Sequence, residues 1–402
     1  MDKETLVIRN RAMAEAYHAT PLKHRIRHWL LRGVRLAPIL RQKSPEKERI
    51  LLIRPDHVGD LLLTLPTIHA LKTARPDAEI HALVGGWSAG VLANIPEIDT
   101  VLTLNFPGFS RNGEGKGGLS PYQLAVKTAR QLRHVGYTSA VILRPDHWWG
   151  ALVTFLAGIP ERIGYATRDV RPFLTHPIPH HHHHAILQNL RLVERWTGEI
   201  PIENIAYHYP IDEADRQFID SYLADCGISP TERLLCIHPG AGTWVKRWDE
   251  HHWAHVADIL SDQLECTVVF TGGGHELPMI RNIINQMKHG ACVMAGNTEI
   301  GQLAALYARA LVVIGPDSGP MHLAAAVKTP TVSLFGPADP LEFAPWGARD
   351  QHYIITSDIG CRPCRVLDWG NDAPEFHPCV RDITTGRVLD AARRAVQATN
   401  RG

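Results

Sequence analysis

The chain has 402 residues, of which 45% are hydrophobic and 21% charged, with a formal net charge of +1. This length exceeds the usual ~100–200 residues of one compact domain, so two domains are expected, and the near-neutral charge argues against a nucleic-acid-binding protein that relies on bulk positive charge. Seven scattered cysteines favour a reducing compartment over a disulfide framework. A charged start and the lack of any apolar run of about 18 residues predict a cytoplasmic protein without a signal peptide.

Residues 1–47 are predicted to form a basic amphipathic helical segment ahead of the first domain. Positions 21–44 carry seven Lys or Arg and no acid, and apolar residues including Trp29 recur there at helical spacing. Such a helix can lie on an anionic membrane surface, which would place the protein peripherally on the inner face of the cytoplasmic membrane. The alternative is that the apolar stripe packs on the protein itself.

Residues 48–205 are predicted to form an α/β domain. Its expected strands are the apolar runs 49–54, 78–85, 99–105 and 139–144, separated by helical stretches and by a Gly/Ser-rich loop at 106–120. Strands that alternate with helices predict a doubly wound parallel sheet, which binds ligands beyond the carboxyl ends of its strands. Arg-Pro-Asp-His follows two of these runs, at 54–57 and 144–147, so both copies are expected at the ligand-binding edge. Only the first continues to an acid, Asp60, at a helix start.

The strand–helix alternation restarts in a second α/β domain, predicted at 206–402. Its expected strands lie within 234–238, 266–274, 310–319 and 329–336. Two doubly wound, Rossmann-like domains are expected to face a central cleft in which two substrates can meet.

Three loops of the second domain carry candidate ligand-binding residues. Asp317, Ser318 and Gly319 lead from a strand into a helix whose free backbone N–H groups can hold a diphosphate, while Asp317 can accept hydrogen bonds from sugar hydroxyls. Asp317 or Ser318 could instead only cap that helix. Lys246, in an earlier loop, can balance a phosphate charge, unless it is a solvated surface lysine. Glu276, after a glycine triplet, can hold ribose hydroxyls.

Together, "RPDHVGDLLLTLP", "HPGAGTWVKRW" and "PDSGPMHLAAAVKTPTVSLFGPADP" resemble glycosyltransferase family 9, which includes the ADP-heptose:lipopolysaccharide heptosyltransferases. The likeness runs from about residue 48 to 390, and the three motifs are specific as a set. It implies a GT-B type fold with an N-terminal acceptor domain and a C-terminal nucleotide-sugar domain. It also implies transfer with inversion of the anomeric configuration and without a catalytic metal or other cofactor.

The resemblance also implies roles for individual residues. Asp60 would be the catalytic base, because an alcohol is a poor nucleophile until it loses its proton. The donor would be bound by Lys246 at its phosphate, by Asp317 at its sugar, and by the Ser318-Gly319 backbone with His322 at its diphosphate. Weaker donor candidates are Thr243, Glu276 and Thr298. From the second copy, the acceptor candidates are Arg144, Asp146 and His147, with plain loop structure as the alternative.

Two further clusters are singled out. Cys361, Cys364, His377 and Cys379 have spacing adequate for a zinc or iron site, and related family members carry a similar cysteine cluster; reduced thiols in a loop are the alternative. The run His180–His184 is interpreted as a native loop on the acceptor side, with no assigned role.

The expected function is therefore transfer of a heptose from an ADP-sugar donor to a lipid-linked saccharide acceptor, such as lipopolysaccharide core, with no nucleic acid involved. One alternative is a nucleotide-sugar 2-epimerase of similar fold, which would not need Asp60. The other is a non-catalytic nucleotide-sugar-binding protein, against which the presence of Asp60 and Lys246 argues.

Overall fold

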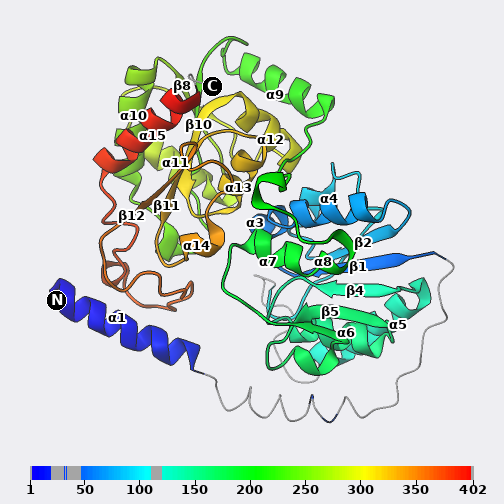
Figure 1. The fold of residues 1–402 in the computed structure, drawn as a ribbon. Coiled ribbons are helices and arrows are strands. Elements are labelled where there is room, and N and C mark those ends of the chain that lie inside the picture. The colour runs from blue at the N-terminus through cyan, green and yellow to red at the C-terminus, as the bar shows by residue number, and fades with distance from the viewer. Residues whose placement is uncertain (1, 20–30, 32, 34–46, 110–119, 400–402) are drawn as a thin grey trace. The chain divides into compact units, whose positions relative to one another are not determined.

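The computed structural model describes residues 2–19, 31, 33, 47–109 and 120–399 (Figure 1). The basic stretch 21–44 therefore lies outside the described residues except at positions 31 and 33, as does most of the loop 106–120. The chain divides into two compact units, one made of residues 20–206 and the other of residues 1–19 together with 207–402.

The unit 20–206 contains one six-stranded sheet in the order β3-β2-β1-β4-β5-β6, with all neighbouring strands parallel. Its strands are β1 (Arg49–Arg54), β2 (Glu79–Val84), β3 (Thr100–Thr103), β4 (Ser139–Ile142), β5 (Glu161–Tyr165) and β6 (His176–Ile178). The first four occur where the sequence predicts them, and β5 and β6 extend the sheet. β1 is buried from Ile50 onward because helices cover both faces of a parallel sheet, so its residues are apolar without alternation.

Helical segments connect and cover these strands. They are α3 (Val58–Leu62), α4 (Leu65–Ala74), η1 (Ala89–Leu92), α5 (Ser120–Val135), α6 (Trp148–Leu156), η2 (Arg171–Phe173), α7 (Ala185–Arg191), α8 (Glu194–Thr197) and η3 (Ile202–Asn204). The strand order reverses between β1 and β4, which pair directly, with Ile53 opposite Ile142. The loops after these two strands carry the two Arg-Pro-Asp-His copies. Both copies therefore lie at the topological switch point, where sheets of this kind bind ligands.

The second unit contains another parallel six-stranded sheet, in the order β12-β11-β10-β7-β8-β9. Its strands are β7 (Leu234–Ile237), β8 (Thr267–Phe270), β9 (Cys292–Val293), β10 (Ala310–Pro316), β11 (Thr331–Phe335) and β12 (His352–Thr356). Its helical segments from residue 213 onward are α9 (Glu213–Asp225), η4 (Trp244–Lys246), α10 (Glu250–Leu264), η5 (Gly274–Glu276), α11 (Leu277–Ile284), α12 (Ile300–Arg309), α13 (Gly319–Ala326), α14 (Pro340–Phe343), η6 (Pro374–Phe376) and α15 (Thr385–Thr399). Here the order reverses between β7 and β10, whose following loops carry the donor candidates Lys246 and Asp317.

The N-terminal helix α1 (Lys3–His18) packs on the unit formed by the other end of the chain. Leu6 joins the hydrophobic core of that unit. Arg9 Nη2 donates to both carboxylate oxygens of Asp372 at 2.8 Å, and Asn10 Nδ2 donates to the carbonyl oxygen of Phe376 at 2.7 Å. Across the described ranges, no helix is long and apolar enough to cross a membrane.

Candidate functional site

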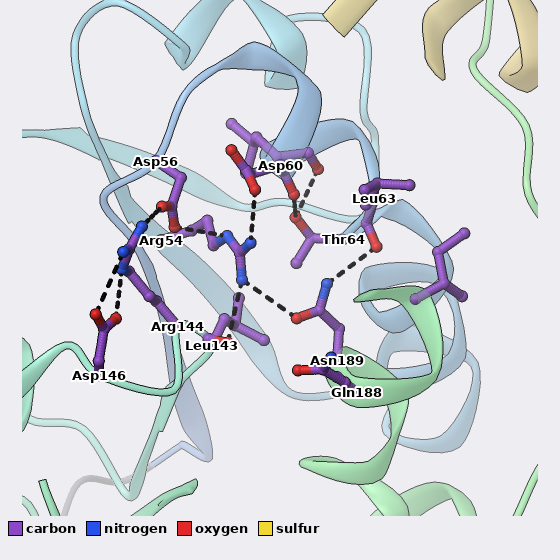
Figure 2. A network of polar contacts seen from close by, with 12 residues as sticks. Arg54, Asp56, Asp60, Leu63, Thr64, Leu143, Arg144, Asp146, Gln188 and Asn189 are labelled. Atoms are coloured by element: carbon purple, nitrogen blue, oxygen red, sulfur yellow. Dashed lines mark hydrogen bonds and ion pairs between the residues drawn. The ribbon is translucent and has the colours of Figure 1, made fainter. Parts of the chain in front are cut away.

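Asp60 lies in the first turn of α3, directly after the first Arg-Pro-Asp-His copy. β1 ends at Arg54, the chain turns through Asp56, and α3 begins at Val58 with His57 as the residue before its first turn. Arg54 Nη2 lies 3.2 Å from Asp60 Oδ1, and the Asp60 side chain is 31% exposed. Asp60 is therefore an accessible carboxylate that an arginine holds at the ligand-binding edge of the sheet (Figure 2).

The two Arg-Pro-Asp-His copies form one polar network (Figure 2). Asp56 of the first copy is buried and forms ion pairs with Arg54, whose Nε lies 2.9 Å from Asp56 Oδ2, and with Arg144 of the second copy. Arg144 Nε also donates to Asp146 Oδ1 at 2.5 Å. An unbroken series of ion pairs thus runs from Asp60 through Arg54, Asp56 and Arg144 to Asp146. The two copies of the motif form this network together, and neither could form it alone.

Burial and charge shift the protonation of this network in opposite directions. Burial raises the pKa of Asp56, but the attraction of Arg54 and Arg144 outweighs it, so the pKa of this carboxyl lies below its usual value. For Arg144, burial lowers the pKa, and the attraction of Asp56 and Asp146 more than reverses this. Asp56 and Arg144 therefore stay ionised. His147, in contrast, has its pKa lowered to about 4, chiefly by burial, and is neutral at physiological pH.

The acceptor candidates Arg144, Asp146 and His147 line one pocket of about 410 Å³. Phe109 and Trp148 contribute aromatic walls, and the remaining lining residues are Pro107, Trp149, Thr167, Arg168 and Asp169. The Arg144 guanidinium lies over the Phe109 ring, 5.1 Å from its centroid. Aromatic faces beside charged hydrogen-bonding groups are suited to a sugar ring, which presents C–H groups on its faces and hydroxyls around its edge.

In the second unit, Lys246 and Asp317 come together from the loops after β7 and β10. Lys246 Nζ lies 2.5 Å from Asp317 Oδ2, and the side chains are 15% and 6% exposed. Lys246 is therefore not a solvated surface lysine, whereas its neighbour Arg247 is exposed. Ser318 precedes α13, yet its side chain makes no capping hydrogen bond. Among the described residues, neither Ser318 Oγ nor the buried hydroxyl of Thr243 has a hydrogen-bond partner. Such hydroxyls are costly unless a ligand or water bonds to them.

The other donor candidates lie around the same sheet edge. Gly319 is the first residue of α13, and His322 is buried one turn later. Glu276 is buried after β8, where Gly273 N donates to its Oε2 at 2.7 Å. A Cβ at Gly240, in the loop after β7, would come within 1.8 Å of Glu276 Oε1, so the two loops meet at this carboxylate. Thr298 lies half-buried in the loop before α12. Because β10, β7 and β8 are adjacent, the loops carrying Asp317, Lys246 and Glu276 share one edge.

The cysteine-rich segment does not form a metal site in the part of the chain that the structure describes, where no three His, Cys, Asp or Glu side chains gather in a suitable group. His377 Nε2 instead lies 2.8 Å from Asp372 Oδ2, within the contact to α1. Burial raises the pKa of Cys379 to about 12 and also raises that of Cys364, which favours thiols over thiolates. In the histidine run, His180 contacts Gln188 and His184 accepts from the N–H of Ile186 at the start of α7.

Three residues of the polar network that includes Asp60 were not singled out as site residues from the sequence: Arg54, Asp56 and Asn189. Arg54 and Asp56 could have been found, since they belong to the repeated motif and the second copy's equivalents were considered. Asn189 carries no such signal. It lies on α7 and reaches Arg54 only because α7 packs beside α4 in the folded unit.

Comparisons with known proteins agree with this geometry. The model of "Glycosyltransferase family 9 (heptosyltransferase)" matches residues 125–369. Lipopolysaccharide heptosyltransferase 2 of Escherichia coli (strain K12) is 27% identical over 355 residues, covering 85% of this chain and 97% of that protein. Lipopolysaccharide heptosyltransferase 3 of the same strain is 29% identical over 300 residues, covering 72% and 82%.

Solved structures show the same architecture. The glycosyl transferase family 9 protein from Veillonella parvula DSM 2008 superposes with a TM-score of 0.72 at 25% identity, covering 89% of this chain and 100% of its own. E. coli ADP-heptose lps heptosyltransferase II gives a TM-score of 0.68 at 23% identity, covering 88% and 99%. The predicted GT-B type fold, with two doubly wound parallel sheets, is thereby confirmed.

Proposed function

The chain belongs to glycosyltransferase family 9, and from this premise we propose that it transfers a heptose from ADP-heptose to a lipid-linked saccharide acceptor such as lipopolysaccharide core. The names of its relatives support the donor sugar and the class of acceptor. The observation that carries the proposal is the position of Asp60: an accessible, arginine-held carboxylate at the switch point of one sheet. A 2-epimerase or a binding protein has no evident use for it.

In the proposed reaction an acceptor hydroxyl oxygen attacks the anomeric carbon of the donor while Asp60 takes the hydroxyl proton. The bond between the anomeric carbon and the diphosphate oxygen breaks, and its electron pair leaves with ADP. Attack from the face opposite the leaving group inverts the anomeric configuration. General-base assistance of this kind typically contributes ~10²–10⁴-fold to the rate.

The donor is proposed to bind the edge that carries Lys246 and Asp317. Lys246 would turn from Asp317 to the diphosphate and offset the charge that develops on ADP, while Asp317 would accept hydrogen bonds from the sugar. The unpartnered hydroxyls of Thr243 and Ser318 would bond to the nucleotide-sugar. The Ser318-Gly319 backbone and His322 would contact the diphosphate, with Glu276 and Thr298 at its periphery. No divalent metal is needed in this scheme.

The acceptor is proposed to occupy the 410 Å³ pocket beside Arg144, Asp146 and His147. A lipid-linked acceptor would be met at the cytoplasmic face of the inner membrane, where the basic stretch 21–44 could contact anionic lipid.

The test is to incubate the full chain with ADP-heptose and a lipid-linked core saccharide and to analyse the products by mass spectrometry. A heptosylated acceptor supports the proposal, release of a free monosaccharide favours the epimerase, and no product favours a binding protein. A thermal-shift assay with ADP-, UDP- and GDP-sugars in parallel identifies the nucleotide of the donor. The preferred donor, at 100 times its dissociation constant, should stabilise the fold by ~2.7 kcal/mol. Clear preference for a UDP-sugar would overturn the heptose assignment.

A further inference from the structure

Arg54 is the residue through which the buried part of the network reaches Asp60. We propose that Arg54 is a positioning residue for the transfer reaction, which fixes the Asp60 carboxylate in place, and that Asp56 and Asn189 in turn hold the Arg54 guanidinium. The inference rests on the proposed function only in taking Asp60 as the base. The contacts themselves are properties of the fold.

Each nitrogen of the Arg54 guanidinium has a different partner (Figure 2). Nε and Asp56 Oδ2 form an ion pair at 2.9 Å that lacks hydrogen-bond geometry, while Nη1 donates to the carbonyl oxygen of Leu143 at 3.1 Å and to Asn189 Oδ1 at 3.4 Å. Nη2 donates to Asp60 Oδ1 at 3.2 Å. The Arg54 side chain is 7% exposed. Because a guanidinium is planar and rigid, the hydrogen bonds at Nη1, together with the charge of Asp56 beside Nε, also set the direction in which Nη2 points.

The residues that hold Arg54 are themselves held. Asn189 is buried, and its Nδ2 donates to the carbonyl oxygen of Leu63 at 3.0 Å, directly after α3. This amide therefore joins Arg54 to the end of the short helix that carries Asp60. Asp56 has Arg144 on its other side, and the carbonyl oxygen of Asp56 accepts from Trp87 Nε1 at 3.0 Å. The support thus comes from three directions, through α7, the second motif and the loop after β2.

A purely structural role would leave part of this arrangement unexplained. Asp56 already has a second arginine, Arg144, to balance its buried charge. The Asp60 side chain is 31% exposed, so water can reach its charge. The Arg54–Asp60 contact is therefore of little use for balancing charge, but it does orient a carboxylate. A neighbouring guanidinium also favours the ionised form, which a general base must have before it can take a proton. Errors of ~1 Å in placing a reacting group can lower rates by ~10²-fold, so such support matters for catalysis.

The experiment compares Arg54→Lys and Arg54→Met with the matched controls Arg144→Lys and Arg144→Met, in steady-state transfer assays with ADP-heptose and a lipid-linked acceptor. Arg54 and Arg144 both pair with Asp56, but only Arg54 has a contact with Asp60 in the network described above. Arg54→Met is expected to lower kcat by roughly 10- to 100-fold with little change in acceptor KM, and Arg54→Lys to restore part of that loss. Arg144→Lys is expected to act mainly on acceptor KM, because Arg144 lines the acceptor pocket.

The pH profile of kcat separates positioning from stability. Without the Arg54 charge, in Arg54→Met, the acidic limb assigned to Asp60 is expected to move to higher pH, whereas Arg144→Met should leave it near its wild-type position. Asp56, Asp146, His57 and His147 are the neighbouring titratable groups, and both arginine substitutions leave their side chains unchanged. An equal shift in the Arg54 and Arg144 variants would assign the effect to the Asp56 site and overturn the inference.

Two further outcomes are decisive. The inference would also be overturned if wild type transfers heptose and the Arg54 variants keep kcat within two-fold of wild type with an unchanged acidic limb. Absence of transfer by wild type would refute the proposed function instead. If the Arg54 variants do not fold, Asn189→Leu tests the proposal instead. This substitution keeps the charge of Arg54 but removes one of the side chains that hold its guanidinium. That variant is expected to lower kcat at an unchanged acidic limb, and wild-type kcat would count against the proposal.

Discussion

Asp56, a buried residue of the first Arg-Pro-Asp-His motif, forms an ion pair with the partly exposed Arg144, from the second motif 88 positions later in the chain. The pairing is possible because β1 and β4 are direct neighbours, so the loops that follow them meet. The two motifs are consequently halves of one network. They are not equivalent, since the first half leads to Asp60 and the second to the wall of the pocket.

The first prediction concerns these two halves. Asp60→Asn should leave the melting temperature and donor affinity near wild type while kcat falls by ~10²–10⁴-fold, because the amide is close to isosteric but cannot take the proton. Asp146→Asn should act mainly on the apparent affinity for the acceptor. Steady-state kinetics and melting curves for both variants are the measurement. An Asp60→Asn protein that turns over within a few-fold of wild type would refute the catalytic assignment.

The second prediction concerns the donor loops. Lys246→Ala should weaken ADP-sugar binding by ~1.5–3 kcal/mol, because a charge-assisted contact to the diphosphate is lost. Arg247→Ala is the matched control: the neighbouring side chain has the same charge but is exposed, so donor affinity should barely change. Isothermal titration calorimetry measures both. Equal donor affinity in the two variants would remove Lys246 from the site.

The third prediction concerns metal ions. The proposed mechanism places Lys246 and the start of α13 at the diphosphate, where other transferases use a divalent cation. Turnover should therefore persist after treatment with EDTA and exchange into metal-free buffer. Full loss of turnover that magnesium restores at once would contradict the scheme.

The fourth prediction concerns His147 and pH. Burial lowers its folded pKa to about 4 from an ordinary 6.5, so below pH 6.5 the unfolded chain binds the proton first. Its stabilising contribution is present above pH 6.5 and is lost as the pH falls toward 4, by about 2 kcal/mol between pH 7 and pH 5. His147→Gln should flatten this dependence in urea unfolding of the unit 20–206. A variant whose unfolding free energy falls as steeply as that of wild type would contradict the buried, neutral histidine.

The fifth prediction concerns the attachment of α1. Arg9 and Asp372 are partly buried, with side chains 25% and 15% exposed, and one guanidinium nitrogen of Arg9, Nη2, donates to both carboxylate oxygens. A double-mutant cycle of Arg9→Ala and Asp372→Asn should give a coupling free energy of about 0.5–1 kcal/mol. Arg11→Ala provides the control, since Arg11 donates to the backbone carbonyl of Gly360 and should show little coupling to Asp372. Zero coupling for Arg9 would mean that this ion pair does not stabilise the attachment of α1 in solution.

The sequence predicted the two sheets well because apolar strand runs and regular strand–helix alternation are local signals. The strands β5, β6, β9 and β12 were not predicted. β6, for example, covers only His176–Ile178, and its first two residues are exposed. The edge positions of Asp60, Lys246 and Asp317 could also be predicted, because strand ends in a parallel sheet share an edge. Contacts between distant loops could not be predicted, since nothing local indicates that Arg54 meets Asn189 or that Lys246 meets Asp317.

The packing of α1 on the last part of the chain has a consequence for how the protein is made. Arg9 and Asp372 are 363 positions apart, so at a translation rate of ~5–20 residues per second roughly 20 to 70 s separate their synthesis. An isolated helix of 16 residues is only marginally stable in water. We therefore expect Lys3–His18 to leave the ribosome without forming a stable helix. These residues should become helical only when the segment from Gly360 to His377 has been synthesised.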